Sequence, residues 1–189
     1  MSDEFSTAVV TGDEWLDRIA RLRVEVWIAE GMTAPGCFPE GRCLEEEDQA
    51  AFHFVIESAD RLVAAGRYTQ YPDLTSTHHG SYYQATGFSL DGPIGIPERV
   101  VVIPEMVGQG LFRRVADALM LQAKQQGARY TLSECSPAAA ASLVRAGRKS
   151  LGKAPPDPRF PGVEFEWILS DVKTASAGIE GQQNNLSDP

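Results

Sequence analysis

The sequence predicts one domain of the α/β (α+β) class built on a mixed sheet, and three features lead to this prediction. A strand, a glycine turn, a helix and a second strand follow one another between residues 99 and 135, which is the order of a parallel crossover unit. Two apolar segments, 52–57 and 62–69, flank a short polar turn and indicate an antiparallel hairpin. Helical and strand periodicities also alternate along most of the chain.

The N-terminal third should contain a strand at 6–11 and an amphipathic helix over Asp13–Ala29. Thr11 and Glu14 fit a capping box for this helix. The segment 31–49 has the glycine, proline and acidic content of a loop. Its acidic run 45–48 is either a wall that attracts a cationic amine or an ordinary solvated charge run. Within the following hairpin, Gly66 indicates a bulge or a close backbone approach.

The crossover unit is the best-defined part of the chain. The β-branched run 100–103 predicts a strand buried on both faces, which Pro104 ends because proline cannot donate a ladder hydrogen bond. Gly108 and Gly110 follow, and a helical period begins at Leu111 and ends at Gly127. Such a turn is either an ordinary tight turn or a site where backbone N–H groups at a helix N-terminus bind phosphate.

The C-terminal part predicts a strand at 128–135, parallel to the first, then a helix at 138–146 and a last strand at 163–169. Residues 71–97 show no clear period. Residues 1–173 are therefore expected to form a single domain, and the polar segment 174–189 is expected to be a disordered tail.

Composition limits the function. With 189 residues, 43% apolar and 23% charged, the chain is typical of a soluble globular protein of one domain, which needs no oligomer for stability. The net charge of −9 disfavours a nucleic-acid partner, and the acidic N-terminus lacks the features of a signal peptide. We expect a cytoplasmic monomer or homodimer with no membrane contact. The three cysteines lack metal spacing, as do His78 and His79, so no metal is expected.

The charge is unevenly distributed. Residues 1–50 carry 12 acidic and 4 basic side chains, whereas residues 111–153 carry 8 basic and 2 acidic ones. A polyanionic cofactor bound near the glycine turn would explain the basic half, and so would an ordinary solvated helix face.

The stretch 101–119, VVIPEMVGQGLFRRVADAL, resembles the acyl-CoA-binding motif of the GNAT acetyltransferase superfamily. Gly108, Gln109 and Gly110 match the core of that motif, whereas Glu105 stands where the family usually has Gln or Arg. In the N-terminal helix, Arg23, Val26, Trp27 and Glu30 fit the phrase R-x-x-V-F-x-x-E of the branch that contains acyl-homoserine-lactone synthases and related acyltransferases.

The resemblance implies a mostly antiparallel, twisted sheet of about six or seven strands with a central splayed parallel pair and about four flanking helices. It also implies acetyl-CoA or another acyl-CoA as co-substrate. Backbone N–H groups of the central strand would meet the pantetheine arm and the thioester, and the turn and first helical residues would hold the pyrophosphate. These expected cofactor-binding residues are Val101, Val102, Ile103, Val107, Gly108, Gln109, Gly110, Leu111, Phe112 and Arg113.

Two carboxylates are placed to act as the general base. Glu98 lies at the start of the central strand and Glu134 near the end of the next one, and each is alternatively a salt-bridge partner of Arg99 or Arg129. The tyrosine that serves as general acid in many family members is replaced by Leu143. Either Tyr82 or Tyr83 substitutes for it, or the thiolate leaves without help, or the protein binds acyl-CoA without turnover.

Two functions follow from this. The first is an N-acyltransferase that moves an acetyl or longer acyl group from acyl-CoA to the amine of a small molecule or amino acid by direct attack in a ternary complex. The second is a non-catalytic acyl-CoA-binding or regulatory module. A carboxylate with a shifted pKa in the cleft would favour the first function.

Overall fold

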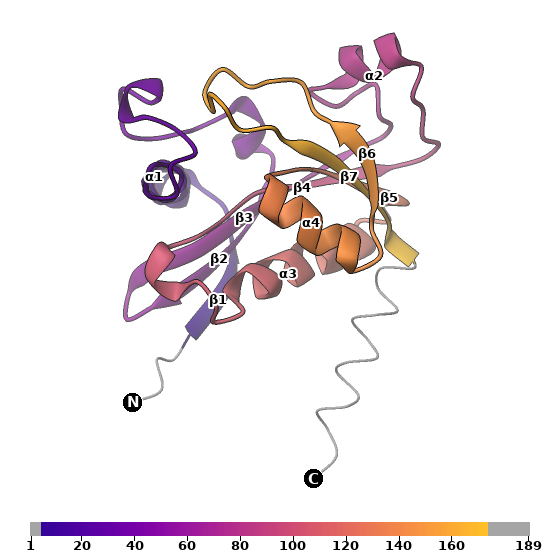
Figure 1. The fold of residues 1–189 in the computed structure, drawn as a ribbon. Coiled ribbons are helices and arrows are strands. Elements are labelled where there is room, and N and C mark those ends of the chain that lie inside the picture. The colour runs from indigo at the N-terminus through magenta and orange to yellow at the C-terminus, as the bar shows by residue number, and fades with distance from the viewer. Residues whose placement is uncertain (1–4, 174–189) are drawn as a thin grey trace.

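The computed structural model describes residues 5–173, which form one seven-stranded sheet with helices on both faces (Figure 1). The predicted tail at 174–189 lies outside the described residues. The strands and helices, in chain order, are β1 Phe5–Val10, α1 Asp13–Ala29, β2 Phe52–Ser58, β3 Arg61–Tyr71, α2 Gly80–Thr86, β4 Ile94–Val102, α3 Leu111–Gln125, β5 Tyr130–Cys135, α4 Pro137–Arg145, β6 Lys149–Lys153 and β7 Glu166–Asp171. Three short 3₁₀ turns, η1 Pro35–Cys37, η2 Glu46–Gln49 and η3 Pro104–Met106, lie in the loops.

The strand order is β1-β2-β3-β4-β5-β7-β6, and every neighbouring pair is antiparallel except β4 with β5. The parallel pair is connected through α3, as the crossover pattern predicts. The sheet has seven strands and the described residues form four α-helices, so the predicted fold class is confirmed.

The two faces of the sheet carry different helices. On β3, Gly66 faces α3, because a Cβ added to it would lie 2.5 Å from Val115 Cγ1. The next side chain, Arg67, points to the opposite face and reaches Asp48, which follows α1 in the chain. On β7, Trp167 packs on Tyr83 of α2, whereas its neighbour Ile168 lies in a cluster with Ala140 of α4. We call these two sides the α1 face, which also carries α2, and the α3 face, which also carries α4.

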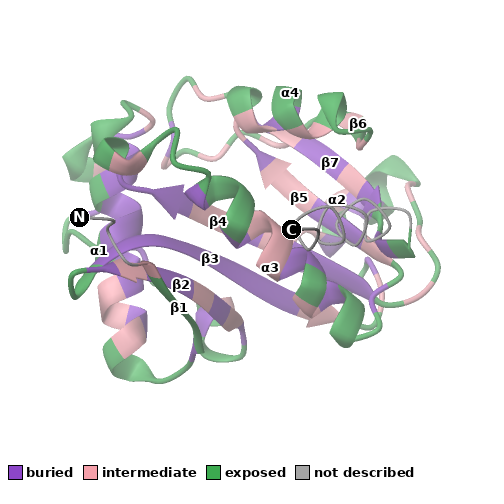
Figure 2. Cartoon of the chain, turned by 90° about the horizontal axis from the view of Figure 1, so that it is seen from below, coloured by how far each residue is buried: buried purple, intermediate pink, exposed green. Residues whose placement is uncertain are grey.

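Strand β3 lies at the centre of the core. It is buried along nearly all of its length, as the purple band in Figure 2 shows. The main apolar cluster packs the buried sides of α1 and α3 against β2, β3 and β4. A second cluster joins α2 to β4, β5 and β7. Beside these apolar clusters, two buried charged side chains, Arg67 of β3 and Glu98 of β4, lie on the α1 face.

Most of the predicted elements are present, and three details differ. The helix Asp13–Ala29 and the hairpin are confirmed, and at Gly66 the structure has both a register shift in the β3–β4 ladder and close packing. The capping box at Thr11 is wrong. The cap residue is Gly12, with φ 100°, whose carbonyl accepts the bond from Leu16 N at 3.1 Å, so the helix begins one residue too late for Thr11 to reach it.

The other two differences concern weak local patterns. Strand β4 begins at Ile94, not at residue 100, and contains Pro97. Its ladder with β5 has already ended at Gly95, so from this point β4 has a strand partner on one side only and tolerates a proline. Helix α2 and strand β6 have no counterpart in the sequence prediction. They contain seven and five residues, too few to establish a period.

Candidate active site

The site begins where the parallel pair separates. Only Ile94 and Gly95 of β4 pair with β5, opposite Tyr130 and Thr131. Beyond this point the two strands diverge, so the edge of β4 that faces β5 has no strand partner there among the described residues. Both strands continue on either side of the gap, and the gap joins the two faces of the sheet.

Backbone alternation shows which amide of β4 is open to this gap. Ile103 N–H donates to the carbonyl of Val63 at 2.9 Å, so it faces β3. Because amides of successive strand residues point to alternate edges, Val101 N–H also faces β3 and Val102 N–H faces the gap. Of these three predicted residues, Val102 is therefore the one whose amide is directed into the gap.

A large cavity of about 1030 Å³ follows the gap and the glycine turn. Eight of the ten predicted cofactor residues line it, namely Val101, Val102, Val107, Gly108, Gly110, Leu111, Phe112 and Arg113. Ile103 is fully buried, and the Gln109 amide donates to Met106 Sδ at 3.1 Å. We call this space the donor cavity.

The glycine turn has the backbone that its two glycines predict. Gly108 has φ 89° and Gly110 has φ 78°, a left-handed region that other residues rarely adopt. A Cβ added to either residue would meet nothing within 4 Å, so the turn is open on its outer side. It leads directly into the 15-residue helix α3, whose N-terminus offers unpaired N–H groups and the positive end of the helix dipole.

A bulge in β4 directs two consecutive charged residues to the α1 face. The β3–β4 register changes between Ala65 and Arg67, and opposite this point Arg99 has a left-handed φ of 54°. A bulge places neighbouring side chains on the same side of a strand. Glu98 and Arg99 consequently both join the charged groups on the α1 face, although the normal alternation of a strand would separate them.

These charged groups form a buried network. Asp48, in η2, accepts two hydrogen bonds from Arg23 of α1 at 2.8 Å each and one from Arg67 of β3 at 2.9 Å. Arg67 also donates to Glu98 at 2.8 Å. The side chains of Arg23, Asp48 and Arg67 are at most 1% exposed. The acidic run 45–48 is therefore only partly solvated, because Glu46 is exposed whereas Asp48 is enclosed by two arginines.

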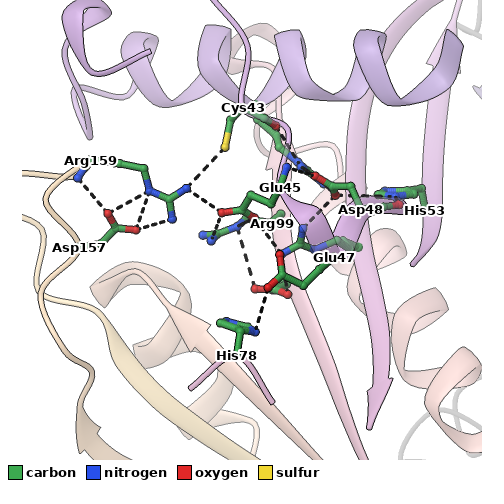
Figure 3. Close-up of polar contacts among 12 residues, drawn as sticks. Cys43, Glu45, Glu47, Asp48, His53, His78, Arg99, Asp157 and Arg159 are labelled. Carbon is green, nitrogen blue, oxygen red and sulfur yellow. Dashed lines mark hydrogen bonds and ion pairs between the residues drawn. The ribbon is translucent and has the colours of Figure 1, made fainter. Parts of the chain in front are cut away.

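Glu45 lies between Arg99 and Arg159 and connects them in the network, as Figure 3 shows. Its carboxylate accepts two hydrogen bonds from Arg99 at 2.8 and 2.9 Å and one from Arg159 at 2.7 Å, and it lies 2.9 Å from Arg67 Nη2. Arg159 in turn pairs with Asp157 at 2.6 Å. The network thus ties η2 and the loop after β6 to the bulge of β4.

The charges in this network stay ionised. Burial alone would raise the pKa of Asp48, but the hydrogen bonds and charge of Arg23, with the charge of Arg67, outweigh burial and lower it to about 2. Burial would likewise raise the pKa of Glu98, and the charges of Arg67 and Arg99 lower it. Because desolvation offsets much of the Coulomb energy of such pairs, they mainly fix the geometry of this face.

A second, polar cavity of about 330 Å³ opens beside the network on the α1 face. Its walls come from the acidic run, the bulge, the residues before α2, the end of β5 and the proline-rich loop after β6. The lining residues are Glu45, Glu47, Arg67, His78, His79, Arg99, Glu134, Pro155, Pro156, Asp157, Pro158 and Arg159. His79 is largely neutral near pH 7, because burial and the neighbouring His78 lower its pKa to about 4.

Glu134 and Arg99 are the two described residues that line both cavities. Glu134 forms no hydrogen bond or ion pair with any described side chain, so the alternative of a salt bridge to Arg99 or Arg129 does not hold for it. Burial raises its pKa to about 7, the nearby charge of Arg99 opposes this, and Glu98 adds to it. A carboxylate with this pKa exists in both protonation states at neutral pH, which suits a general base.

The other predicted base has a different environment. Glu98 is 3% exposed at its side chain and pairs with Arg67 at 2.8 Å and, more loosely, with Arg99 at 4.0 Å. Glu98 is therefore a salt-bridge partner, which was the alternative to its role as general base. Glu98 does line the donor cavity, but its lowered pKa makes it a weak base.

The sequence indicates a pairing role for only one of the four arginines in this network, Arg99, as a salt-bridge partner of Glu98. Arg67 and Arg159 carry no motif, and Arg23 was noted only as part of the helix phrase. One signal was available: Arg23 lies on the apolar stripe of α1, between Ile19 and Val26, where a charge requires a buried partner. Leu143 lines the donor cavity at the position of the missing tyrosine.

Taken together, a splayed parallel pair, a glycine turn at a helix N-terminus and a free carboxylate between two cavities define the class of acyl-CoA-dependent acyltransferases. Residues 14–147 match the acetyltransferase (GNAT) family. The chain belongs to this family, whose members transfer acyl groups from acyl-CoA to amines, and it is an N-acyltransferase. A search of curated protein sequences finds no match.

Solved structures agree with the family at the level of the fold. The polyamine N-acetyltransferase of Drosophila melanogaster is 16% identical with a TM-score of 0.65, over 89% of this chain and 100% of that one. The CoA-dependent acyl-homoserine lactone synthase BjaI is 14% identical with a TM-score of 0.65, over 92% and 87%. FeeM, an N-acyl amino acid synthase from uncultured soil microbes, is 11% identical with a TM-score of 0.63, over 92% and 94%. Each helix in the described part of the chain is too short or too polar to cross a bilayer.

Proposed function

We propose that the enzyme binds acyl-CoA in the donor cavity and an amine in the polar cavity, and that the two react at the gap between β4 and β5. The observation that carries this proposal is the position of Glu134, an unpaired carboxylate in the wall of both cavities. A direct transfer requires such a meeting point, because the amine must reach the thioester carbon while both substrates are bound.

The donor is held mainly by backbone groups. The N–H groups of Gly108, Gly110, Leu111 and Phe112 bind the pyrophosphate at the start of α3, with Arg113 beside them. Those of Val107 and Gln109 already donate to the carbonyls of Pro104 and Met106 and keep the turn in shape. The amide of Val102 donates to the thioester oxygen, where negative charge develops as the amine attacks. The roles of Val101 and Ile103 are then to hold β4 against β3, so that this amide remains exposed.

Glu134 is the general base. A protonated amine cannot attack, and the tetrahedral adduct must lose an N–H proton before it collapses. Glu134 is the carboxylate best placed for this step, because it faces the cavity that receives the amine and is not neutralised by an ion pair. Its pKa of about 7 predicts that kcat/KM rises with pH through this value.

The polar cavity is suited to a small acceptor that carries both charges. Glu47 and Glu134 present carboxylates to it, and Arg99 presents a guanidinium whose Nη1 donates no hydrogen bond to the described residues. We propose an amino acid or a related amine with an anionic group, whose amine lies at Glu134 and whose anion lies at Arg99. The acidic run contributes one end of this cavity and does not act as a uniformly acidic wall.

The alternative, a binding or regulatory module without turnover, is favoured by one observation, the apolar Leu143 in the donor cavity. Release of free thiol separates the two functions. The purified chain is incubated with acetyl-CoA or longer acyl-CoAs and a set of amines, each amino acid being paired with its decarboxylated analogue. We expect thiol release that depends on the amine and is larger for the amino acids.

Glu134→Gln should lose on the order of 10²–10⁴-fold in kcat/KM. The matched control is Glu25→Gln, which changes an exposed glutamate and should not lose activity. A thermal shift with acyl-CoA but no thiol release with any amine would support the binding module instead. We also propose that the protein acts in the cytoplasm as a monomer or homodimer and without nucleic acid, in keeping with its net charge of −9.

A further inference from the structure

The tyrosine that protonates the leaving thiolate in many family members is absent from this protein. When the tetrahedral adduct collapses, the sulfur of CoA departs as a thiolate and needs a proton to prevent the reverse reaction. Leu143 has no proton to give, although it lines the donor cavity. The alternative donors Tyr82 and Tyr83 line neither cavity, and Tyr83 is only 3% exposed.

The other ionisable groups near the gap are poor proton donors. Cys135 follows Glu134 on β5, and burial raises the pKa of its thiol to about 12. Transfer from it to a CoA thiolate, whose conjugate thiol has a pKa of about 8.5, would be uphill. Arg99 lines both cavities, but the charges of Glu98 and Glu45 raise its pKa despite burial, so it keeps its proton.

Glu134 is therefore the one described residue that lines both cavities and can both accept and release a proton. We propose that Glu134 takes the proton from the attacking amine and returns the same proton to the departing thiolate, so that one carboxylate serves as base and acid. This inference rests on the proposed function. It requires no further residue on the α3 face, and it accounts for a turnover site that has Leu143 in place of the tyrosine.

The proton balance is complete within one cycle. The neutral amine forms a bond to the thioester carbon, and the carbonyl oxygen becomes an oxyanion. The adduct nitrogen gives one proton to the Glu134 carboxylate, and the amide forms as the C–S bond breaks. The thiolate then takes that proton, which leaves an amide, a free thiol and ionised Glu134. No proton needs to exchange with water, because Glu134 stands between the two substrates.

A comparison of leaving groups tests this proposal. The wild-type chain and Glu134→Gln are assayed with one amine and two donors, acetyl-CoA and 4-nitrothiophenyl acetate, after subtraction of the uncatalysed rate. The aryl thiolate is stable without a proton, whereas the CoA thiolate is not. We expect the rate of Glu134→Gln to fall at least about tenfold more with acetyl-CoA than with the aryl thioester. With acetyl-CoA the variant lacks both the base and the acid, whereas the aryl thioester needs only the base.

The alternative outcomes each have a clear meaning. An equal loss with both donors would overturn the acid role and leave Glu134 as the base alone. No loss with either donor would overturn the inference while leaving acyl transfer established. If the wild-type chain acylates no amine from either donor, the proposed function fails, and this inference with it. Unfolding curves of the variant at pH 8 show that it is folded, and Glu25→Gln serves as the matched glutamate that should lose nothing with either donor.

Discussion

At the scale of single residues, Asp48 is the most deeply buried carboxylate of the network on the α1 face. It accepts hydrogen bonds from both Arg23 and Arg67 and from the backbone N–H of Glu45 at 2.8 Å. Removal of the carboxylate leaves two buried guanidinium groups without this partner. A buried pair is of modest net benefit while it is intact, but a broken one leaves an uncompensated charge.

Asp48→Ala should therefore lower the free energy of unfolding by about 3–5 kcal/mol. Urea unfolding at pH 7 measures this loss, and Glu25→Gln, in an exposed pair with Arg61, should leave the midpoint unchanged. The folded-state pKa of Asp48 lies below its reference value, so its contribution is present above pH 3.8 and is lost as the pH falls through about 2. A loss as small as that of Glu25→Gln would mean that the network contributes little to folding.

Glu134 should have the opposite effect on stability. Burial raises its pKa from 4.5 to about 7 in the folded state, so the folded protein binds a proton that the unfolded chain releases. Stability from this group is full below pH 4.5 and is lost as the pH rises through 7. Glu134→Gln should consequently be as stable as the wild type at pH 4 and more stable at pH 8, by on the order of 1–3 kcal/mol.

Urea unfolding of both proteins at the two pH values measures this difference. A variant that is less stable at pH 8 would show that the carboxylate has a stabilising partner in the folded state. The expected combination, a more stable protein with lower activity, is typical of a group that is retained for chemistry at a cost to the fold.

At the scale of elements, the contact between α3 and β3 sets the position of α3, a helix that lines the donor cavity. Gly66 lies under α3, and a Cβ there would be 2.5 Å from Val115 Cγ1 and 2.9 Å from Leu119 Cδ1. Gly66→Ala should cost about 1–3 kcal/mol by overpacking and should move α3 away from the sheet. Because the glycine turn precedes α3, binding of CoA should weaken as well.

The double variant Gly66→Ala with Val115→Ala tests this cause directly. It should be more stable than the sum of its single effects predicts, because the smaller side chain makes room for the new methyl group. The matched control is Gly36→Ala, at a position where an added Cβ meets nothing within 4 Å. Additive losses in the double variant would show that the backbone of β3, and not its packing on α3, is the sensitive feature.

The helices and strands also show how much of the fold could be predicted from the sequence. The crossover from β4 to β5, the hairpin of β2 and β3, and helix α1 were predictable because each has a long period or a glycine at a fixed position. The network was not predictable, because its members come from α1, η2, β3, β4 and the loop after β6 and meet only in space. The left-handed Arg99 could not be foreseen either, since the bulge that requires it depends on the pairing of β4 with β3.

The candidate site likewise has one part that could be predicted from the sequence and one part that could not. The backbone part, around the glycine turn, was accessible from sequence because glycine at Gly108 and Gly110 reports a backbone conformation. The side-chain part was not, because Glu98 and Glu134 look alike in the sequence. Only their surroundings distinguish them: two arginines beside Glu98, and two open cavities beside Glu134.

At the scale of the whole molecule, the proposed sites for the pyrophosphate and for the amine lie on opposite faces of the sheet. The glycine turn and α3 lie on one side, and the polar cavity with its charged network lies on the other. The gap beyond Gly95 and Thr131 is where the two sides meet. Acyl-CoA and the amine should therefore bind without competing, and no residue needs to carry the acyl group between them.

Steady-state kinetics test this arrangement. Double-reciprocal plots at several amine concentrations should intersect, because transfer occurs in a ternary complex, and parallel lines would instead indicate a covalent acyl-enzyme. Free CoA should compete with acyl-CoA, since both need the glycine turn, and should be noncompetitive with the amine. If CoA competes with the amine as well, the two cavities overlap when occupied. The cross-sheet arrangement would then be wrong even where the family and the fold are right, because neither of these decides which face the amine occupies.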